Sequence, residues 1–278
     1  MPAGVDDRPD SIVGLRGVAQ TFDTGTRALA DVDLDIRTGE FLTIVGPSGC
    51  GKSTLLRLIA GLAPPTEGRI AWWGEAFDKT GREGRRIGFV FQSPTLMPWA
   101  SVAANVRLPL DLGHVPRADA DAAVAQALAR VGLSQARDHL PRQLSGGMQM
   151  RASIARALVT APDLLLMDEP FGALDEFTRQ RLDDDLLAVW RSQRLTVVFV
   201  THSLHEAVFL STRVVVMGAH PGRILAAFDI DEPYPRNVEY RLSPAFAAIA
   251  QRISACVAKA SAGALPDSAS APMPANVR

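Results

Sequence analysis

The chain has 278 residues, 47% of them hydrophobic, and a formal net charge of −1 at pH 7. This length allows a sizeable buried core, and the charge balance gives no indication of nucleic-acid binding. No apolar run approaches the ~18 residues of a membrane-spanning helix, and the acidic start, with Asp6, Asp7 and Asp10, is unlike a secretory signal, so we expect a cytoplasmic protein that reaches a membrane only through a partner.

Residues 11–45 predict antiparallel β structure followed by a buried strand. Over residues 11–40, Val32, Leu34 and Ile36 alternate with acidic side chains, which is the period of a half-exposed strand. The apolar run 41–45 then predicts a buried strand, and apolar residues at helical spacing after the next loop predict a helix. The sequence therefore places a strand–loop–helix unit directly after the antiparallel region.

The loop between this strand and helix, residues 46–53, fits the phosphate-binding pattern G-x-x-x-x-G-K-[ST]. Glycines let successive backbone N–H groups point at phosphate oxygens, and the following helix presents its positive N-terminal end to the same anion. Lys52 adds a charge at the outer phosphates, and the Ser53 hydroxyl can bind Mg²⁺. Cys50 either fills space inside the loop or acts as a redox switch. The predicted nucleotide-binding residues of this segment are Gly46, Pro47, Ser48, Gly49, Cys50, Gly51, Lys52, Ser53 and Thr54.

The middle of the chain predicts two more strands and then helices. Residues 69–74 read as a strand with an aromatic pair, and residues 87–91 as a buried strand followed by a proline-broken loop. Residues 101–141 are Ala-rich with apolar residues at helical spacing, and residues 145–159 predict a further helix. We therefore expect a helical region in the middle of the chain.

The second half of the chain predicts three strands and a terminal helix. Short apolar runs over 164–167 and 196–200 are typical of central parallel strands, and residues 214–217 predict another strand. Residues 244–257 place their apolar side chains on one helical face. Ala, Ser and Pro dominate residues 258–278, which predicts a disordered tail.

Two acids directly follow the predicted strand 164–167. A buried parallel strand holds side chains at its carboxyl end, which is where α/β sheets bind ligands. Asp168 is therefore predicted to orient Mg²⁺, and Glu169 to act as the general base that polarises an attacking water. A second predicted anion site lies at a helix start with exposed amides and a capping hydroxyl, formed by Ser145, Gly146, Gly147 and Met148.

In their order and spacing, these motifs resemble the ATP-binding subunit of an ABC transporter. The resemblance is carried by the phosphate loop, Leu-Ser-Gly-Gly-Met at 144–148, Leu-Leu-Leu-Met-Asp-Glu-Pro at 164–170, Ala-Leu-Asp at 173–175 and Thr-His at 201–202, and it covers roughly 11–225. It implies an α/β fold: a P-loop NTPase core with an antiparallel β subdomain and an α-helical subdomain. The implied boundaries are 11–240 for the ATPase domain, about 95–160 for the helical subdomain and 241–257 for a C-terminal helix.

The resemblance also implies roles for single residues, each with a simpler alternative. Phe22 resembles the aromatic residue that stacks on adenine, or is a core residue at a strand end. Gln92 resembles the glutamine that reaches Mg²⁺ and the attacking water, or is a loop residue. His202 resembles the histidine that contacts the γ-phosphate, or is structural. Asp175 resembles an acid of the inter-subunit loop, or caps a helix over 176–191.

Two departures from the family pattern concern residues beside these motifs. Met148 stands where Gln is commoner, and Ser203 where Asp is frequent. Neither side chain is needed for phosphate binding, so the expected fold and hydrolysis do not change.

A narrower resemblance indicates the kind of transport. Residues 91–99, 102–106, 220–224 and 234–236 resemble the nitrate/sulfonate/taurine group of bacterial importers, although importers for pyrimidine precursors of thiamine share these features. The implied function is ATP hydrolysis that drives uptake of a small anionic or heterocyclic solute. The alternatives are export and a nucleic-acid or ribosome process, but the single cassette and the absence of a basic patch disfavour the second.

The resemblance finally implies cofactors, partners and a location. ATP and Mg²⁺ are expected at the interface of two copies packed head to tail, with each ATP between the phosphate loop of one copy and the Ser145 helix of the other. Transmembrane permease subunits are expected to meet the segment after Gln92, where Leu96, Met97 and Trp99 suit an apolar docking groove; the alternative is that Trp99 is core. A solute-binding protein is an indirect partner, and the expected location is the cytoplasmic face of the inner membrane.

Overall fold

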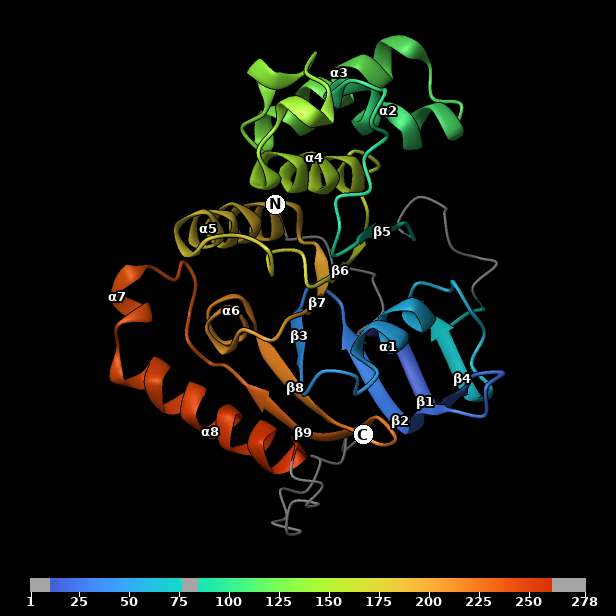
Figure 1. Cartoon of the computed structure of the whole chain (residues 1–278), viewed down its shortest axis with the longest axis vertical. Helices are drawn as coiled ribbons and strands as arrows, with labels where there is room; N and C mark the ends of the chain where they lie inside the picture. Colours follow the sequence, from blue (N-terminus) through green and yellow to red (C-terminus); the bar gives the residue numbers. More distant parts are fainter. Residues whose placement is uncertain (1–10, 77–84, 262–278) are drawn as a thin grey trace, which may run out of the picture.

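A six-stranded sheet lies at the centre of the computed structural model, which describes residues 11–76 and 85–261 (Figure 1). Its strand order is β5-β6-β7-β3-β8-β9; all neighbours are parallel except the antiparallel pair β8 and β9 at one edge. The predicted α/β class is confirmed. The strands are β3 (Phe41–Val45), β5 (Ile87–Val90), β6 (Leu164–Asp168), β7 (Thr196–Val200), β8 (Arg213–Gly218) and β9 (Arg223–Asp229).

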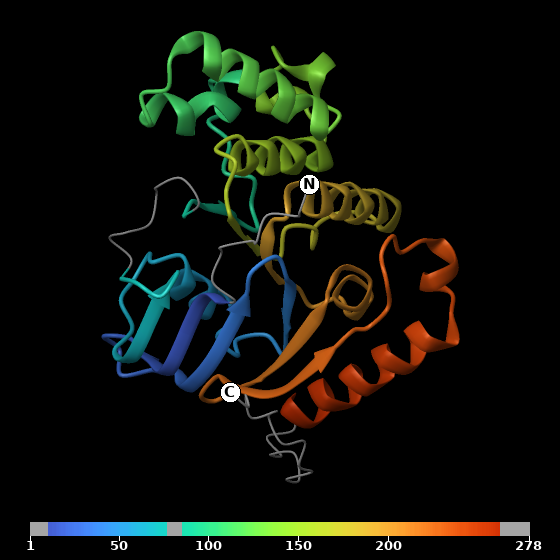
Figure 2. The ribbon, with the colours of Figure 1, turned by 180° about the vertical axis from the view of Figure 1, so that it is seen from behind.

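A second, three-stranded antiparallel sheet lies beside the central one, in the order β2-β1-β4 (Figure 2). Its strands are β1 (Ser11–Thr21), β2 (Arg27–Arg37) and β4 (Glu67–Trp72). In β2, Val32, Leu34 and Ile36 are buried, whereas Asp31 and Asp33 are exposed and Asp35 is half-buried. The alternation predicted for this strand is therefore confirmed.

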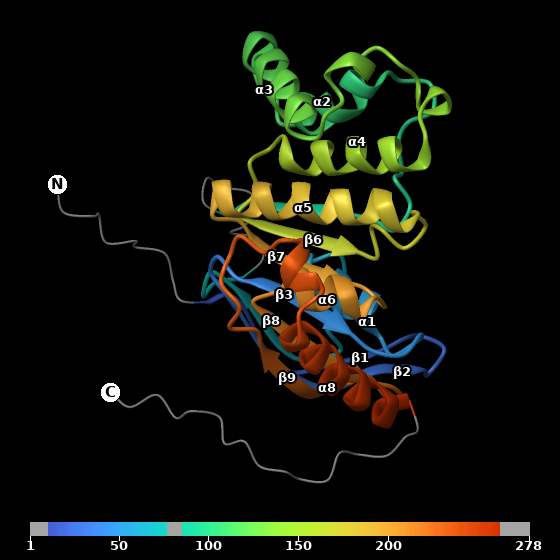
Figure 3. The same ribbon diagram turned by 90° about the vertical axis from the view of Figure 1, so that its left-hand side faces the viewer.

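Helices cover both faces of the central sheet. Helix α1 lies between it and the small sheet, whereas α6 and α8 cover the opposite face. Figure 3 shows α4 stacked on α5, with α2 and α3 beyond them at the end farthest from α8. The helices are α1 (Lys52–Ile59), α2 (Val102–Leu112), α3 (Arg117–Arg130), α4 (Gly146–Leu158), α5 (Glu176–Gln193), α6 (Leu204–Leu210), α7 (Val238–Arg241) and α8 (Pro244–Ser261).

The buried side chains divide into two apolar clusters, one on each face of the central sheet. Within β3, Leu42 and Ile44 join the cluster under α1 and the small sheet, whereas Phe41 and Val45 join the one that continues into the helical region. Alternate residues of a strand point to opposite faces, so a strand buried on both sides must be apolar throughout. This explains the continuous apolar runs in the sequence.

Side chains cap several of the helices that carry predicted site residues. The Ser145 hydroxyl accepts from the Met148 backbone N–H at the start of α4. Asp175 accepts from the Thr178 N–H at 3.0 Å at the start of α5, as its capping alternative requires. Each cap satisfies a donor that the helix itself leaves unpaired.

The structure corrects several predicted element boundaries. β5 ends at Val90 and is an edge strand, so Phe91 is 38% exposed instead of part of a buried strand. β4 runs Glu67–Trp72 instead of 69–74. The stretch 101–141 divides into two helices and two short 3₁₀ turns, Ser134–Ala136 and Pro141–Gln143.

The C-terminal segment also differs from the prediction. The predicted C-terminal helix 241–257 is observed as α8, which begins at Pro244, and residues 258–261 belong to α8 although the composition predicted a disordered tail. Residues 262–278 and Asp6, Asp7 and Asp10 lie outside the described residues. Within 11–76 and 85–261, no helix has both the length and the apolar character that crossing a bilayer requires.

Candidate functional site

An open cavity of about 440 Å³ lies over the phosphate loop. Its lining includes Ser48, Lys52 and Ser53 from the loop, Phe22 from the end of β1, and Glu169 from the end of β6. Phe22 is 47% exposed, so it is not the core residue of its alternative interpretation. The structure therefore brings together predicted nucleotide-binding and catalytic residues that lie far apart in the sequence.

The backbone of the phosphate loop depends on glycine at two positions. Gly51 has φ +94, and a Cβ there would lie 2.7 Å from Leu29 Cδ2. A Cβ at Gly46 would lie 2.5 Å from the Met217 carbonyl oxygen. Gly51 is also the N-cap of α1 and provides no side-chain cap, so the first N–H groups of α1 remain available for an anion.

The charged groups of the loop are held in defined positions. Lys52 is buried, and its ammonium donates to the carbonyl oxygens of Gly46 at 2.9 Å and Pro47 at 3.1 Å. The Ser53 hydroxyl donates to Asp168 Oδ1 at 2.9 Å, because β6 ends beside the start of α1. Burial raises the pKa of Asp168, and the Ser53 hydrogen bond opposes this shift.

The donor set at Ser53 and Asp168 fits Mg²⁺. A hydroxyl and a carboxylate are hard oxygen ligands, and Mg²⁺ is usually held by one or two carboxylates together with water and substrate phosphates. Among the described residues, no group of three or more His, Cys, Asp or Glu side chains gathers into a larger cage. The chemistry of these two side chains therefore suits a cation that arrives with a nucleotide.

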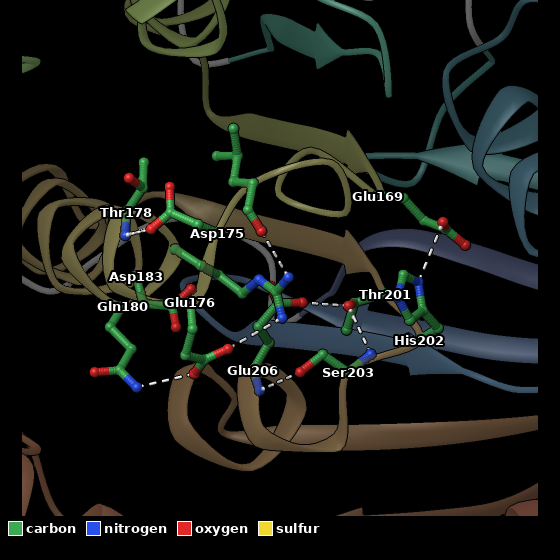
Figure 4. Close-up of polar contacts among 12 residues, drawn as sticks. Glu169, Asp175, Glu176, Thr178, Gln180, Asp183, Thr201, His202, Ser203 and Glu206 are labelled. Atoms are coloured by element: carbon green, nitrogen blue, oxygen red, sulfur yellow. Dashed lines mark hydrogen bonds and ion pairs between the residues drawn. The ribbon is translucent and has the colours of Figure 1, made fainter. Parts of the chain in front are cut away.

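Glu169 lines the cavity, and His202 lies beside Glu169. His202 Nδ1 is 3.4 Å from Glu169 Oε2 (Figure 4), and the His202 side chain is 61% exposed. Glu169 has φ +44, a left-handed conformation that costs a non-glycine residue ~1–3 kcal/mol and persists where surrounding structure fixes it. Here its N–H donates to the Val200 carbonyl and its carbonyl accepts from the Gly172 N–H.

Other predicted site residues do not line this cavity. Gln92 is exposed beyond the end of β5, and Ser145 and Gly146 are exposed at the start of α4 in the helical region. Cys50 is buried behind the loop, where burial raises the pKa of its thiol. This favours the space-filling interpretation of Cys50, because the thiolate is the reactive form.

The cavity also includes residues that the sequence analysis did not place in the site. His220 and Pro221 line it from the turn between β8 and β9. The next residue, Gly222, exchanges backbone hydrogen bonds with Ala28 and Ala30 of β2, at 2.9 and 3.0 Å. No sequence signal indicated that this turn packs beside the phosphate loop.

Comparison with known proteins shows the family of this chain. Residues 29–172 match the model of the ABC transporter family. The aliphatic sulfonates import ATP-binding protein SsuB of Bacillus licheniformis is 44% identical over 82% of this chain and 86% of its own. The taurine import ATP-binding protein TauB of Rhizobium johnstonii is 46% identical over 77% of this chain and 80% of its own.

A solved structure shows the same architecture. A dimeric ATP-binding cassette in a post-hydrolysis state, bound to ADP and Pi, superposes with a TM-score of 0.71 and 32% identity, over 80% of this chain and 100% of that one. The family match, the relatives and the shared cassette fold confirm the resemblance seen in the motifs. The chain is an ATPase that belongs to the ABC transporter family.

Proposed function

We propose that this chain is the ATP-hydrolysing subunit of an importer for a small sulfonate or taurine-like solute. The observation that carries the hydrolytic part is the placement of Glu169, fixed in a left-handed conformation at the cavity edge, 3.4 Å from His202 and beside the phosphate loop. The relatives named for sulfonate and taurine import support the solute class.

In this proposal the loop residues bind the triphosphate. The free N–H groups of α1 and the Lys52 ammonium would bind phosphate oxygens, and Phe22 would stack on the base. Ser53, Asp168 and Gln92 would hold Mg²⁺, which neutralises phosphate charge when bound. In the described structure, the Lys52 ammonium donates to two carbonyl oxygens of its own loop, which leaves one of its three N–H donors for a phosphate oxygen.

Glu169 and His202 would perform the protein's part of hydrolysis. A carboxylate at the cavity edge can accept a hydrogen bond from the attacking water and polarise it. His202 lies beside that carboxylate and can donate to a phosphate oxygen from the same edge. Both side chains follow parallel strands of the central sheet, whose carboxyl ends form the ligand-binding edge.

A second copy of the chain would complete the site. The Ser145 helix start is exposed and does not line the chain's own cavity. Its amides and those of Gly146 and Gly147 suit an anion presented from outside. The dimeric form of the similar cassette supports this arrangement, in which Ser145 of one copy would face the phosphate loop of the other.

The permease would dock on the segment after Gln92. Trp99 is 77% exposed, which overturns its core alternative. The segment is nevertheless well held: the Asn105 side chain accepts from the Met97 N–H and donates to the Met97 and Ala100 carbonyls, at 2.7–3.1 Å. A rigid loop that presents a large aromatic side chain is a typical anchor for a protein partner. Docking there would place the chain at the cytoplasmic face of the membrane.

Reconstitution with the permease and solute-binding protein tests the proposed function. We expect ATP hydrolysis in proteoliposomes to be stimulated by the binding protein loaded with an alkanesulfonate or taurine, together with inward solute movement. Nitrate and a thiamine pyrimidine precursor serve as comparison solutes. Stimulation only by one of these would refute the solute class, and solute movement in the outward direction only would refute import.

A further inference from the structure

A buried polar network lies behind the Glu169–His202 edge (Figure 4). Its centre is Glu206 in the first turn of α6, which is only 3% exposed. Glu206 Oε2 accepts a short hydrogen bond from the Thr201 hydroxyl, and Glu206 Oε1 lies 3.5 Å from Arg179 Nε of α5. Neither of the last two atoms has a hydrogen-bond partner among the described residues. The contact is therefore ionic and leaves both groups incompletely satisfied.

One end of this network fixes the backbone around His202. The Thr201 hydroxyl, which donates to Glu206, also accepts from the Ser203 N–H at 3.0 Å. The Ser203 hydroxyl in turn accepts from the Glu206 N–H at 3.3 Å. The residues on both sides of His202 are thus bonded to each other and to Glu206, Thr201 through the Glu206 carboxylate and Ser203 through the Glu206 N–H.

The other end fixes the backbone before Asp175. Arg179 donates from Nη2 to the Leu174 carbonyl at 2.9 Å, and its Nη1 is 3.4 Å from Glu176 Oε2. The guanidinium has a planar fork of donors, so it can hold a carbonyl and face a carboxylate at the same time. Arg179 therefore connects the loop that ends in Asp175 to the Glu206 carboxylate.

Charge neutralisation alone does not account for this arrangement. Arg179 is not needed to neutralise the other buried acid, Asp183. That carboxylate has a basic neighbour of its own, because Arg241 Nη1 lies 3.5 Å from Asp183 Oδ2. Burial raises the pKa of Glu206, and the Thr201 hydrogen bond and the Arg179 charge oppose the shift. A buried pair that served only to cancel charge would be no better than an apolar pair. This pair is also bonded to the Leu174 carbonyl on one side and, through the Thr201 hydroxyl, to the Ser203 N–H on the other.

We propose that Arg179 and Glu206 are positioning residues for ATP hydrolysis: together they hold the His202 loop and the Asp175 loop in one fixed relation. The inference rests on the proposed roles of His202 and Asp175. Neither Arg179 nor Glu206 touches the cavity over the phosphate loop. They are expected to affect the rate of hydrolysis through the loops they connect and to leave nucleotide binding unchanged.

Three substitutions test the network in the complex with the permease. Glu206→Gln keeps the shape and removes the charge, Arg179→Lys removes the fork, and Thr201→Val removes only the hydroxyl. Each should lower kcat by about tenfold or more, because small displacements of catalytic groups are costly. The KM for ATP and the Kd for a fluorescent ATP analogue should stay within about twofold. Arg181→Lys, an exposed arginine on the same helix, is the matched control and should behave as wild type.

A double-mutant cycle separates a shared link from independent damage. If Arg179 and Glu206 act through one contact, the Arg179→Lys/Glu206→Gln double variant should lose about as much kcat as the more damaging single variant. Losses that multiply would overturn the link. Parallel loss of kcat, ATP affinity and melting temperature would also overturn it, because that pattern indicates a structural role only.

Two reference variants distinguish failure of this inference from failure of the proposed function. His202→Ala and Glu169→Gln should each lower turnover by on the order of 10²-fold in the same assay. If they do and the network variants hydrolyse ATP at the wild-type rate, the positioning role of Arg179 and Glu206 is wrong. If His202→Ala itself hydrolyses ATP normally, the proposed role of His202 is wrong, and the inference built on it falls as well.

Discussion

Replacing Trp99 by alanine tests where the permease binds. The residue is 77% exposed, so only about a quarter of its surface is buried in the subunit alone. A tryptophan side chain offers up to roughly 250 Å², and losing ~60 Å² of buried area at ~25 cal/mol per Å² costs about 1.5 kcal/mol. At ~2–4 °C per kcal/mol, the melting temperature of the isolated subunit should fall by no more than about 6 °C.

The same substitution should have a larger effect on assembly. A large aromatic side chain that fills a partner groove typically contributes ~2 kcal/mol or more to binding, which corresponds to about 30-fold in Kd. The assay is the affinity of the purified subunit for the detergent-solubilised permease, with ATP affinity measured in parallel and expected to be unchanged. Leu112→Ala is the matched control, because Leu112 is another strongly exposed apolar residue of the helical region.

Two results would refute this reasoning. A permease affinity within threefold of wild type would show that Trp99 is not an anchor. A fall in melting temperature of ~10 °C or more would show that the side chain stabilises the fold of the subunit, as a buried tryptophan would at ~3–5 kcal/mol. In that case the exposed loop would no longer support the position of the permease.

Three further predictions concern the site and its surroundings. Glu169→Gln should keep ATP affinity within about twofold and lower turnover by on the order of 10²-fold. Equilibrium binding of a fluorescent ATP analogue measures the affinity and phosphate release in the assembled transporter measures the turnover; turnover within threefold of wild type would contradict the base assignment. Gly51→Ala should abolish ATP binding and lower the melting temperature, because its φ of +94 and the 2.7 Å approach to Leu29 exclude a Cβ; calorimetric ATP binding at wild-type affinity would contradict this. Burial, followed by the charge of Glu206, raises the pKa of Asp183 well above 3.8, so the folded state keeps a proton that the unfolded chain loses. The free energy of unfolding should therefore fall as pH rises from about 4 toward the folded-state pKa. Denaturant titrations of Asp183→Asn should show a flatter profile over that range, and an unchanged slope would contradict the assignment.

The sequence predicted best the parts of the site that one continuous segment builds. The phosphate loop is a strand, a loop and a helix in succession, so its glycines and Lys52 carry a complete local signal. Ser53 and Asp168 were each predicted to bind Mg²⁺, Asp168 because it follows a parallel strand at the ligand-binding edge of the sheet. The observed 2.9 Å hydrogen bond between them agrees with that argument.

Features that depend on packing between distant segments were missed. β5 was predicted as a buried strand because its residues are apolar, but it is the edge strand of the central sheet. The residues of one strand do not reveal its position in the order of the sheet. Residues 258–261 were assigned to the tail on composition, whereas Ala260 is buried in the last turn of α8. His220 reaches the cavity through backbone pairing between Gly222 and β2, which no local pattern reveals.

The burial of Glu206 is another feature that depends on packing and that the sequence does not reveal. An acidic residue in the first turn of a helix normally faces solvent, where it complements the helix dipole, and the sequence gives no reason to read it otherwise. The structure buries it with one hydroxyl and one incompletely paired arginine, which is costly for a carboxylate. An arrangement that lowers folding stability persists where it benefits the function of the protein. The groups that Glu206 holds are the neighbours of His202, so the gain that we infer is a fixed histidine at the edge where hydrolysis is proposed to occur.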